Sequence, residues 1–552
     1  MATLGTIGGV AHPPGYPLYL IWLRAFSWLP AQSPAHASAI ATAILGALGV
    51  LVLHAACRAW GARPRAASLT VAIFAAAPAV LRIQTEAEVF AMNNLIVALV
   101  LWLSATRGPL RGYARIFALG LVAGFGLSDH LTCVLAAPVG ILGVVRGVRE
   151  TKTGAVGGIG IAIAGLVLGL TPYLYLLATH DTNISWTRID DVTHLVHHFL
   201  RKDYGGPGAF SPHGKEVSAL ESIWVMVQTV GRTWLWLPAI AGVAVLVRCI
   251  ARAHDSETRV AWSMLAVSFV LAGPALASRF NVVPEGIGLY VVRRFHILPA
   301  LLLAPAVAVA FDHAATWLER RSEARAIRSD VVGGVLAIIS FAAFTGLSLD
   351  HVVRVHSPAV DLGLRQTLRS LPKDAVVIVH PDLMHFGLGY LQGAERERPD
   401  VTVISWAQVP SLTYRQRMAK SGIDLEPRAN GRITTVDVAE QVLAKGRPLL
   451  IDPYNSNIAQ AFPTYPFGIL FRVVPKEQRP PSIEEVFTTN RDLFEHFDFS
   501  YPMPGFDDEY ATDLHQQYAR LWHTLAKGLE MAGRGEDAAV ANAFAEALAP
   551  KP

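Results

Sequence analysis

Long apolar runs dominate the first two thirds of the chain and predict transmembrane helices. A helix needs about 17 to 25 mostly apolar residues to cross a hydrocarbon core of roughly 30 Å. Runs of this kind occur about ten times, and several are separated by turns so short that the helices must form hairpins. The predicted spans are residues 36–60, 66–83, 87–106, 114–129, 131–147, 155–178, 230–252, 259–279, 295–317 and 331–349.

A shorter apolar stretch precedes the first predicted span. Residues 15–29 contain Arg24 and end in a break rich in Pro and Ser, so they suit a helix lying in the membrane interface better than a span. Trp22 and Trp28 fit the aromatic belt of that interface.

Beyond residue 355 the pattern changes to alternating helix and strand signals, which predict a small α/β domain. The last residues form a pattern of two amphipathic helices on either side of 533–535, similar to one tetratricopeptide unit. A single unit of this kind cannot form a solenoid, so a hairpin that caps the α/β domain is favoured.

The predicted fold is a mostly α, polytopic membrane helix bundle with a small α/β domain that ends in a helical hairpin. Helices are expected near 362–371, 383–391 and 436–444, and strands at 375–379, 401–405 and 448–451, with 468–474 a further candidate. The predicted domains are 1–35 (loop with interfacial helix), 36–350 (transmembrane), 356–500 (α/β) and 501–552 (hairpin).

The composition agrees with a membrane protein. Hydrophobic residues make up 52% of the 552 residues and charged residues only 16%, which excludes an ordinary soluble protein. The net charge of +4 comes with Arg clusters between apolar segments, not on a basic face, so no nucleic-acid partner is predicted. The three cysteines lie in or beside apolar segments and do not indicate a disulfide scaffold.

The Arg clusters fall in alternate loops and mark those loops as cytoplasmic. An even number of spans then places both ends of the chain, and the α/β domain, outside. The richness in Ala and Arg is compatible with a bacterial inner membrane, which is the predicted location. The clusters are Arg58, Arg63 and Arg65; Arg107, Arg111 and Arg115; Arg146, Arg149 and Lys152; Arg248, Arg252 and Arg259; and Arg320, Arg321, Arg325 and Arg328.

Polar and charged residues collect at the predicted exterior helix ends. Together they suit a substrate with an apolar tail in the bilayer and an anionic, sugar-bearing head, because Arg binds phosphate through charge-assisted hydrogen bonds and a carboxylate can deprotonate a hydroxyl. The simpler alternative is that helix ends carry polar residues because they face lipid headgroups. These residues are His12, Glu86, Glu88, Asp129, His130, Arg232, Arg279, Glu285, Arg293, Arg294 and His296.

A histidine group in the long loop after the sixth predicted span suggests a metal site at first. The spacing of His194, His197 and His198 could place two imidazoles on one helix face, but the loop offers only Asp190, Asp191 and Asp203 as acidic partners. An interfacial helix face is favoured, and neither a metal nor another cofactor is predicted.

Several motifs resemble a largely uncharacterised family of membrane proteins related to protein O-mannosyltransferases, within the glycosyltransferase C superfamily. The resemblance extends from residue 12 to about residue 414, and HPPGYPLY is its most specific piece. The motifs are HPPGYPLY at 12–19, TEAEVFAMNN at 85–94, GLSDHLT at 126–132, PYLYL at 172–176, ISW at 184–186 and RRFHILPA at 293–300.

The resemblance implies transfer of a sugar from a polyprenyl-phosphate carrier to an acceptor hydroxyl, on a protein or a glycan, by one inverting displacement outside the membrane. It makes Glu88, with Glu86 beside it, the candidate catalytic carboxylate. It assigns substrate binding to His12 and Tyr16 near the sugar, to Asp129 and His130 in the same cavity, and to Arg293 and Arg294 on the carrier phosphate.

One departure from the family pattern bears on activity. The superfamily's catalytic base lies in the first exterior loop after a first span, whereas residues 1–11 contain neither Asp nor Glu. The expectation is therefore an N-terminus truncated before that span, with the base upstream of Met1. Two alternatives to an enzyme stay open: a catalytically inactive receptor or scaffold of the same fold, and a transporter or lipid flippase, which predicts broken helices with polar residues at mid-membrane.

Overall fold

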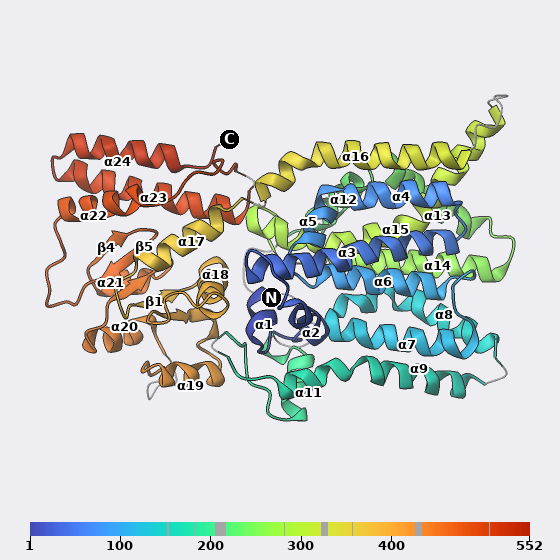
Figure 1. The fold of residues 1–552 in the computed structure, drawn as a ribbon, viewed down its shortest axis with the longest axis horizontal. Coiled ribbons are helices and arrows are strands. Elements are labelled where there is room, and N and C mark those ends of the chain that lie inside the picture. Colours follow the sequence, from blue (N-terminus) through green and yellow to red (C-terminus); the bar gives the residue numbers. More distant parts are fainter. Residues whose placement is uncertain are drawn as a thin grey trace. The chain divides into compact units, whose positions relative to one another are not determined.

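The computed structural model describes residues 1–151, 154–182, 184–204, 217–280, 282–321, 329–355, 357–425, 433–506 and 508–551 (Figure 1). The chain divides into two compact units. Unit 1 comprises Met1–Thr179 and Ile189–Val352, and unit 2 comprises His180–Arg188 and Val353–Pro552.

Unit 1 is a bundle of helices, and the long ones run lengthwise beside one another (Figure 1). The most extensive packing joins α7 to α9, α3 to α6 and α13 to α15. Its helices are α1 (Ala2–Ile7), α2 (Pro17–Phe26), α3 (Pro34–Ala59), α4 (Pro64–Ala76), α5 (Pro78–Thr85), α6 (Phe90–Ser104), α7 (Gly112–Asp129), α8 (Ala137–Arg149), α9 (Ala155–Gly169), α10 (Leu174–Ala178), α11 (Val192–Phe199), α12 (Ala219–Thr233), α13 (Leu237–Ala251), α14 (Ser256–Val270), α15 (Gly286–Arg321) and α16 (Ser329–Val355). Short 3₁₀ or π segments at Leu131–Ala136, Thr171–Tyr173, Lys202–Tyr204 and Leu271–Ala275 lead into or out of these helices.

Unit 1 carries helices of membrane-spanning length, so the protein is an integral membrane protein. Within the described residues, five segments are long and apolar enough to cross a bilayer, or seven if each of two bent helix pairs crosses once. The predicted count of about ten is therefore not confirmed. The five segments are Pro34–Ala59, Leu131–Arg149, Ala155–Ala178, Ser256–Ala275 and Gly286–Trp317.

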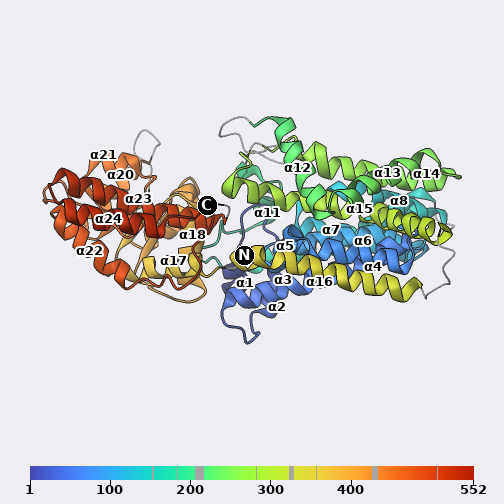
Figure 2. The ribbon, with the colours of Figure 1, turned by 90° about the horizontal axis from the view of Figure 1, so that it is seen from above.

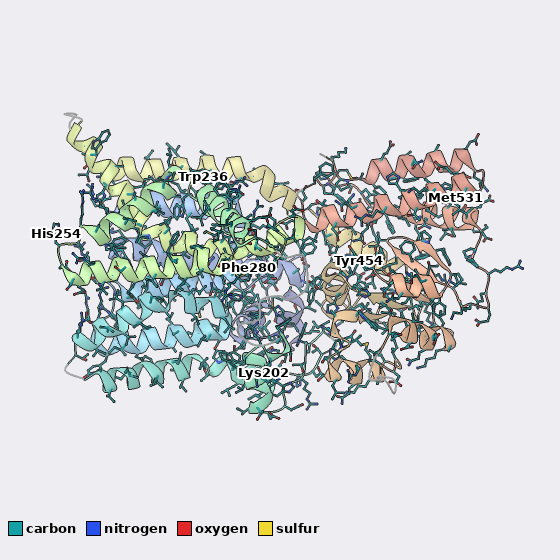
Figure 3. The ribbon with its side chains drawn as sticks, turned by 180° about the vertical axis from the view of Figure 1, so that it is seen from behind. Lys202, Trp236, His254, Phe280, Tyr454 and Met531 are labelled. Carbon is teal, nitrogen blue, oxygen red and sulfur yellow. The ribbon has the colours of Figure 1, made fainter. Side chains whose placement is uncertain are left out.

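The prediction of one continuous span over 230–252 is wrong. The structure has two helices there, α12 and α13, bent by 105°. Trp234 is fully buried and its indole N–H donates to the carbonyl of Ala300 at 3.1 Å, while Leu235 and Trp236 adopt positive φ of 57° and 59°. Trp236 is labelled at this break in Figure 3. The apolar run continues through the break because the turn is formed by the buried Trp234 and by the apolar residues Leu235 and Trp236.

The predicted span 66–83 is also broken, into α4 and α5 with a 71° bend. Ala77 is extended there, and Pro78 begins the second helix. Proline lacks the N–H that would continue the first helix, so the chain restarts at that residue.

Glycines allow the close approach of α7 and α9. A Cβ at Gly120 would lie 2.1 Å from the carbonyl oxygen of Ala162, and one at Gly165 would lie 2.4 Å from that of Phe117. Small residues at such crossings let helix backbones approach closely, which is a common way to pack helices in membranes.

Unit 2 is a mixed five-stranded sheet covered by helices. The strand order is β2-β1-β3-β5-β4, in which β2, β1 and β3 are parallel and β5 and β4 are antiparallel to their neighbours. The strands are β1 (Val376–Val379), β2 (Thr402–Ser405), β3 (Leu449–Ile451), β4 (Thr464–Phe467) and β5 (Leu470–Val473). The helices are α17 (Ala359–Ser370), α18 (Asp382–Gly393), α19 (Leu412–Lys420), α20 (Thr435–Ala444), α21 (Ser456–Ala461), α22 (Ile483–Glu495), α23 (Tyr510–Met531) and α24 (Gly535–Leu548), with a 3₁₀ turn at Trp406–Gln408.

The central strand β1 is buried on both faces, so its residues are continuously hydrophobic. Val377 and Val379 join one core with residues of α17, α18, α22, α23 and α24. Val376 and Ile378 point to the opposite face and join a second core with α19, α20 and α21. Helices α23 and α24 lie side by side in both views (Figures 1 and 2), and Trp522 stacks on Phe544 between them.

The loop segment 180–188 belongs to unit 2. Arg417 of α19 is 6% exposed; it donates to a carboxylate oxygen of Asp181 at 2.7 Å and to the carbonyl of Ser185 at 2.9 Å. Ser185 itself is fully buried. The arginine therefore holds this segment at Asp181 and at Ser185, the middle residue of the ISW motif.

We expect Arg417→Met to release this segment. Losing two hydrogen bonds to a charged, buried donor costs about 1–3 kcal/mol each, so amide hydrogen exchange at 184–188 should become at least about 30-fold faster. Arg415→Met on the same helix is the matched control, because among the described residues Arg415 donates to the carbonyls of Val409 and Pro410, which lie just before its own helix. Equal exchange in the two variants would contradict the anchoring role.

Candidate active site

The loop that joins α1 to α2 carries the first two candidate residues. Pro17 begins α2, and Tyr16 precedes it with φ of 47°. The Tyr16 hydroxyl lies 3.5 Å from Nδ1 of His12, and the two rings meet edge to face with centroids 5.1 Å apart. The side chains of the HPPGYPLY motif thus form a local pair.

The course of this loop depends on Gly15 and on α11. Gly15 has φ of +99°, and a Cβ there would lie 2.7 Å from Leu176 and 3.3 Å from His198. Nε2 of His198 donates to the carbonyl of Ala11 at 3.0 Å. His198 is 1% exposed, and burial lowers the pKa of its imidazole to about 4. The histidine is therefore a neutral buried support for the loop, whereas the sequence favoured an interfacial face.

We expect Gly15→Ala to destabilise the loop more than Gly8→Ala. Both glycines have positive φ, which costs a residue with a side chain about 1–2 kcal/mol. Only Gly15 also meets a clash, since the nearest atom to a Cβ at Gly8 is 3.4 Å away, and overpacking adds about 1–3 kcal/mol. Thermal unfolding of the detergent-solubilised protein would show the difference, and equal losses would contradict the steric argument.

Glu88 lies in the turn between α5 and α6 and faces α15. Its Oε1 is 3.7 Å from a guanidinium nitrogen of Arg294, and both side chains are partly buried. The charge of Glu88 also acts on His12 and Tyr16. Glu88 therefore connects the first loop, the second turn and α15 in one cluster.

Glu86 is two residues away but is bound differently. One of its carboxylate oxygens accepts from Nε of Arg82 at 2.6 Å and the other accepts from the hydroxyl of Tyr290 at 2.8 Å. The Arg82 guanidinium also lies over the Tyr290 ring at 4.2 Å. Both oxygens of Glu86 are thus engaged in structural bonds.

Aromatic rings surround the Glu88–Arg294 pair. The Arg294 guanidinium lies 5.2 Å from the Phe90 ring centroid and 4.8 Å from that of Tyr290. His130 stacks on Tyr16 at 5.9 Å with 7° between the ring planes, and it contacts Phe90 at 5.1 Å. Such faces attract cations and reduce access of water, which strengthens the local electrostatics.

The same ring cluster continues to Phe295 and Phe280. Phe295 follows Arg294 on α15 and lies 5.2 Å from Phe90 and 4.8 Å from Phe280, which is labelled in Figure 3. The cluster therefore combines the acid Glu88, the guanidinium of Arg294, two imidazoles and several rings from five separate parts of unit 1.

The His12 imidazole is neutral at physiological pH. Burial lowers the pKa of His12 to about 4, and the nearby charge of Glu88 offsets only part of that effect. Burial, helped by the same carboxylate, raises the pKa of the Tyr16 hydroxyl. Both side chains can exchange hydrogen bonds with a polar ligand, but neither adds charge to the cluster.

Asp129 takes a different position from the one the sequence suggests. It ends α7, is fully buried, and neither carboxylate oxygen has a hydrogen-bond partner among the described residues. Its charge acts on Tyr19, Cys133 and Tyr173. Its chain neighbour His130, and not Asp129, makes the ring contacts of the cluster.

Arg293 occupies a different position on α15 from Arg294. Successive residues of a helix lie about 100° apart around its axis, so the two side chains leave the helix in different directions. The charge of Arg293 acts on His296, which is 2% exposed and lies 3.3 Å from the hydroxyl of Thr229. The contacts from α15 to Glu88 and Phe90 involve Arg294.

Residues 6–153 match the family described as Protein O-mannosyl-transferase TMEM260 N-terminal domain. Protein O-mannosyl-transferase TMEM260 of Mus musculus is 24% identical over 424 residues, which cover 75% of this chain and 59% of the mouse protein. The chain is related to the protein O-mannosyl-transferases. Protein O-mannosyl-transferase tmem260 of Dictyostelium discoideum is 21% identical over 584 aligned positions, which cover 95% of this chain and 68% of that protein.

Two solved structures of ArnT from Cupriavidus metallidurans are also similar. The apo structure gives a TM-score of 0.47 at 15% identity, and the one bound to undecaprenyl phosphate gives 0.48 at 14%; each covers 85% of this chain and 89% of the ArnT chain.

The comparisons leave the cellular location open. Both named TMEM260 relatives come from eukaryotes. The predicted bacterial inner membrane therefore stays a prediction, whereas the membrane placement itself agrees with the apolar helices of unit 1.

The match to the TMEM260 N-terminal domain contains most of the predicted site. His12, Tyr16, Glu88 and His130 lie within residues 6–153, whereas Arg294 comes from α15, outside that match. The functional roles of all eight predicted site residues stay predictions.

Sequence reasoning did not name Arg82, Phe90 and Tyr290, which contact the candidate residues, or the further rings Phe280 and Phe295. Two of them carry a readable signal, because Arg82 lies four residues before Glu86 and Tyr290 lies four residues before Arg294, the spacing of neighbours on a helix face. Phe90 lies inside the quoted TEAEVFAMNN motif, but only the fold brings its ring beneath an arginine.

Proposed function

We propose that the chain is a membrane glycosyltransferase that transfers a sugar from a polyprenyl-phosphate carrier to a hydroxyl group of a protein on the exterior face of the membrane. The printed names of its relatives support transfer of mannose to protein oxygen. The observation that carries the proposal is the Glu88–Arg294 pair, held at 3.7 Å within a ring cluster at the ends of α5, α6 and α7.

The pair offers a base and a cation at one place. Arg294 suits a carrier phosphate, because a guanidinium forms several charge-assisted hydrogen bonds to phosphate oxygens. When the phosphate occupies Arg294, the carboxylate of Glu88 loses its partner and becomes available to an acceptor hydroxyl. His12 and Tyr16, with their hydrogen-bonding groups 3.5 Å apart, can then bind hydroxyls of the sugar.

The chemical step is one displacement at the anomeric carbon. The acceptor oxygen forms the new bond to that carbon while the bond from the carbon to the phosphate oxygen breaks, and the bonding electrons leave with the polyprenyl phosphate. The acceptor proton passes to Glu88, which acts as general base. Arg294 stabilises the charge that grows on the phosphate in the transition state.

The geometry favours Glu88 over Glu86 as the base. Both carboxylate oxygens of Glu86 accept hydrogen bonds from protein groups, at 2.6 Å and 2.8 Å, so a substrate hydroxyl would have to displace one of them. Glu88 has a longer contact to a residue that the donor itself would engage. Glu86 instead positions Arg82 and Tyr290 beside the site.

Reconstitution tests the proposal directly. The purified chain in lipid nanodiscs would be incubated with radiolabelled polyprenyl phosphomannose, or the phosphoglucose analogue, and with Ser- and Thr-containing acceptor proteins. Label in the protein, released by alkaline elimination, is the expected result. Failure with both donors, for protein that binds the polyprenyl phosphate, would contradict the proposal.

One observation favours the inactive receptor as a second candidate. Residues 1–11 hold no Asp or Glu, whereas the family resemblance expects an acidic base in the first exterior loop. The two candidates differ in the same assay, because a receptor binds the acceptor protein without transferring label to it. The bent pairs α4–α5 and α12–α13 are the feature that a transporter would also show.

A further inference from the structure

The carboxyl ends of the parallel strands in unit 2 form a second polar site, separate from the cluster in unit 1. His380 follows β1, Trp406 follows β2, and Asp452 follows β3. The chain leaves β1 towards β2 on one side and later returns to β3 on the other. Ligands of open α/β sheets bind at such a switch point, outside the carboxyl ends of the strands.

A pocket of about 250 Å³ opens at this edge. That volume lies below the roughly 300–1,000 Å³ of pockets for drug-sized ligands, so it suits one small ring. None of the residues that line it in the described part of the chain is Lys or Arg, which disfavours a phosphate or carboxylate ligand. The lining includes His380, Trp406, Thr434, Tyr454, Asn455 and Asn457.

The floor of the pocket is a fixed polar network. Asp452 is 1% exposed and accepts from the backbone N–H groups of His380 and Tyr454, the latter at 2.9 Å. The Asn455 amide nitrogen donates to Asp452 at 3.0 Å and to the carbonyl of Ile378 at 3.1 Å. These two donated bonds determine which end of the amide is nitrogen.

The same network leaves two buried side-chain atoms without a hydrogen-bond partner among the described residues: Nδ1 of His380, and Oδ1 of Asn455, which is an acceptor. Asn455 is 3% exposed, and its Oδ1 has no hydrogen-bond partner among the described residues. A buried amide oxygen without a partner costs about 1–3 kcal/mol, which a ligand with an O–H or N–H donor would recover. A ligand that donates a hydrogen bond would therefore suit this part of the pocket.

Two aromatic side chains line the pocket above this floor. Trp406 lies beside His380, with ring centroids 6.3 Å apart, and Tyr454, labelled in Figure 3, is 52% exposed. Rings with an apolar face and a polar edge match a ligand that has both kinds of surface. A sugar ring has an apolar C–H face and hydroxyl donors around its rim.

We infer that this pocket binds one neutral sugar residue, with its C–H face on Trp406 or Tyr454 and a hydroxyl donating to Oδ1 of Asn455. The Thr434 hydroxyl and the Asn457 amide supply further partners for the ring hydroxyls. The inference rests on unit 2 alone and holds whether or not unit 1 transfers a sugar.

Saturation-transfer NMR of the full-length protein in nanodiscs tests this inference. The probes are the methyl glycosides of mannose, glucose, galactose and N-acetylglucosamine, with inorganic phosphate as the anionic comparison. The wall variants assign the signal to this pocket, because Tyr454 and Trp406 belong to unit 2 and not to the candidate active site. Tyr454→Ala and Trp406→Ala remove the walls, and Phe506→Ala is the matched control, because Phe506 is an aromatic residue of the same unit that is 58% exposed and does not line the pocket.

The expected result is saturation of at least one glycoside, weakened about fivefold to tenfold by Tyr454→Ala and unchanged by Phe506→Ala. Tyr454 is exposed, so this variant keeps the test valid even if Trp406→Ala does not fold. Three outcomes would overturn the inference: no glycoside binds, binding survives both wall variants, or phosphate binds while no glycoside does.

Discussion

Glu88→Gln is expected to lower kcat for sugar transfer by about 10²–10⁴-fold, the range that general base catalysis contributes. Glutamine keeps the size of the side chain but cannot take a proton from the acceptor hydroxyl. It also releases Arg294 from its 3.7 Å contact, so KM for the polyprenyl-phosphate donor should stay the same or fall. Initial rates in nanodiscs at saturating acceptor would separate the two constants.

Glu285→Gln is the matched control for this variant. Glu285 is an exposed acid directly before α15, so its loss removes the same charge near the same helix without touching the cluster. Glu86→Gln should instead lower the unfolding temperature, because it weakens the bonds to Arg82 and Tyr290. Transfer that is undiminished in folded Glu88→Gln protein would refute Glu88 as the base.

The sequence predicts the α/β unit best where strands are buried on both faces. The strands expected at 375–379, 401–405 and 448–451 match β1, β2 and β3, which are short hydrophobic runs bounded by polar residues. The run 468–474 corresponds to β5, but its partner β4 was missed. That strand reads TYPF, and a proline within four residues argues against a strand in any pattern analysis. Helices α19, α21 and α22 were also missed.

The spans were harder to predict, because hydropathy reports how long an apolar segment is and not whether the helix bends within it. Residues 230–252 are apolar throughout, yet Trp234 is buried against α15 and the chain turns by 105°. A window of mean hydropathy cannot detect such a turn, since aromatic residues count as membrane-compatible whether they continue a helix or end it. Part of the last Arg cluster, Arg325 and Arg328, and Lys152 lie outside the described residues.

For the candidate site, the sequence predicted which residues lie near one another but not which way each side chain points. The motifs placed Glu88, His130 and Arg294 near one level of the membrane, and the structure brings them into one cluster. Whether Asp129 or His130 faces that cluster depends on the rotation of α7 about its axis. Packing of the whole bundle sets that rotation, so adjacent residues could not be separated from the sequence.

Arg294→Met is expected to lower kcat/KM for the polyprenyl-phosphate donor by about 10²–10³-fold, the usual cost of removing one fixed donor to a developing negative charge. Methionine retains the apolar stem between Phe90 and Tyr290 but supplies no cation. Arg294→Lys should recover only part of the loss, since an ammonium restores charge without the planar stacking on those rings. Donor-dependent initial rates, with thermal unfolding measured in parallel, would check both variants.

Arg293→Met is the control that the helix itself provides. It removes the same charge one residue away, from a position about 100° around the helix from Arg294, and the charge of Arg293 acts on His296. An equal loss in Arg293→Met would mean that both arginines hold the phosphate and that the structure misplaces the site.

The double variant Glu88→Gln with Arg294→Met tests whether the pair acts as a unit. If the pair is only structural, removing both charges leaves no unpaired partner and should restore stability and activity together. If the two residues serve one transition state, stability recovers in the double variant, while the transfer rate stays as low as in the less active single variant. The losses in rate are then not additive, because both groups act in the same step.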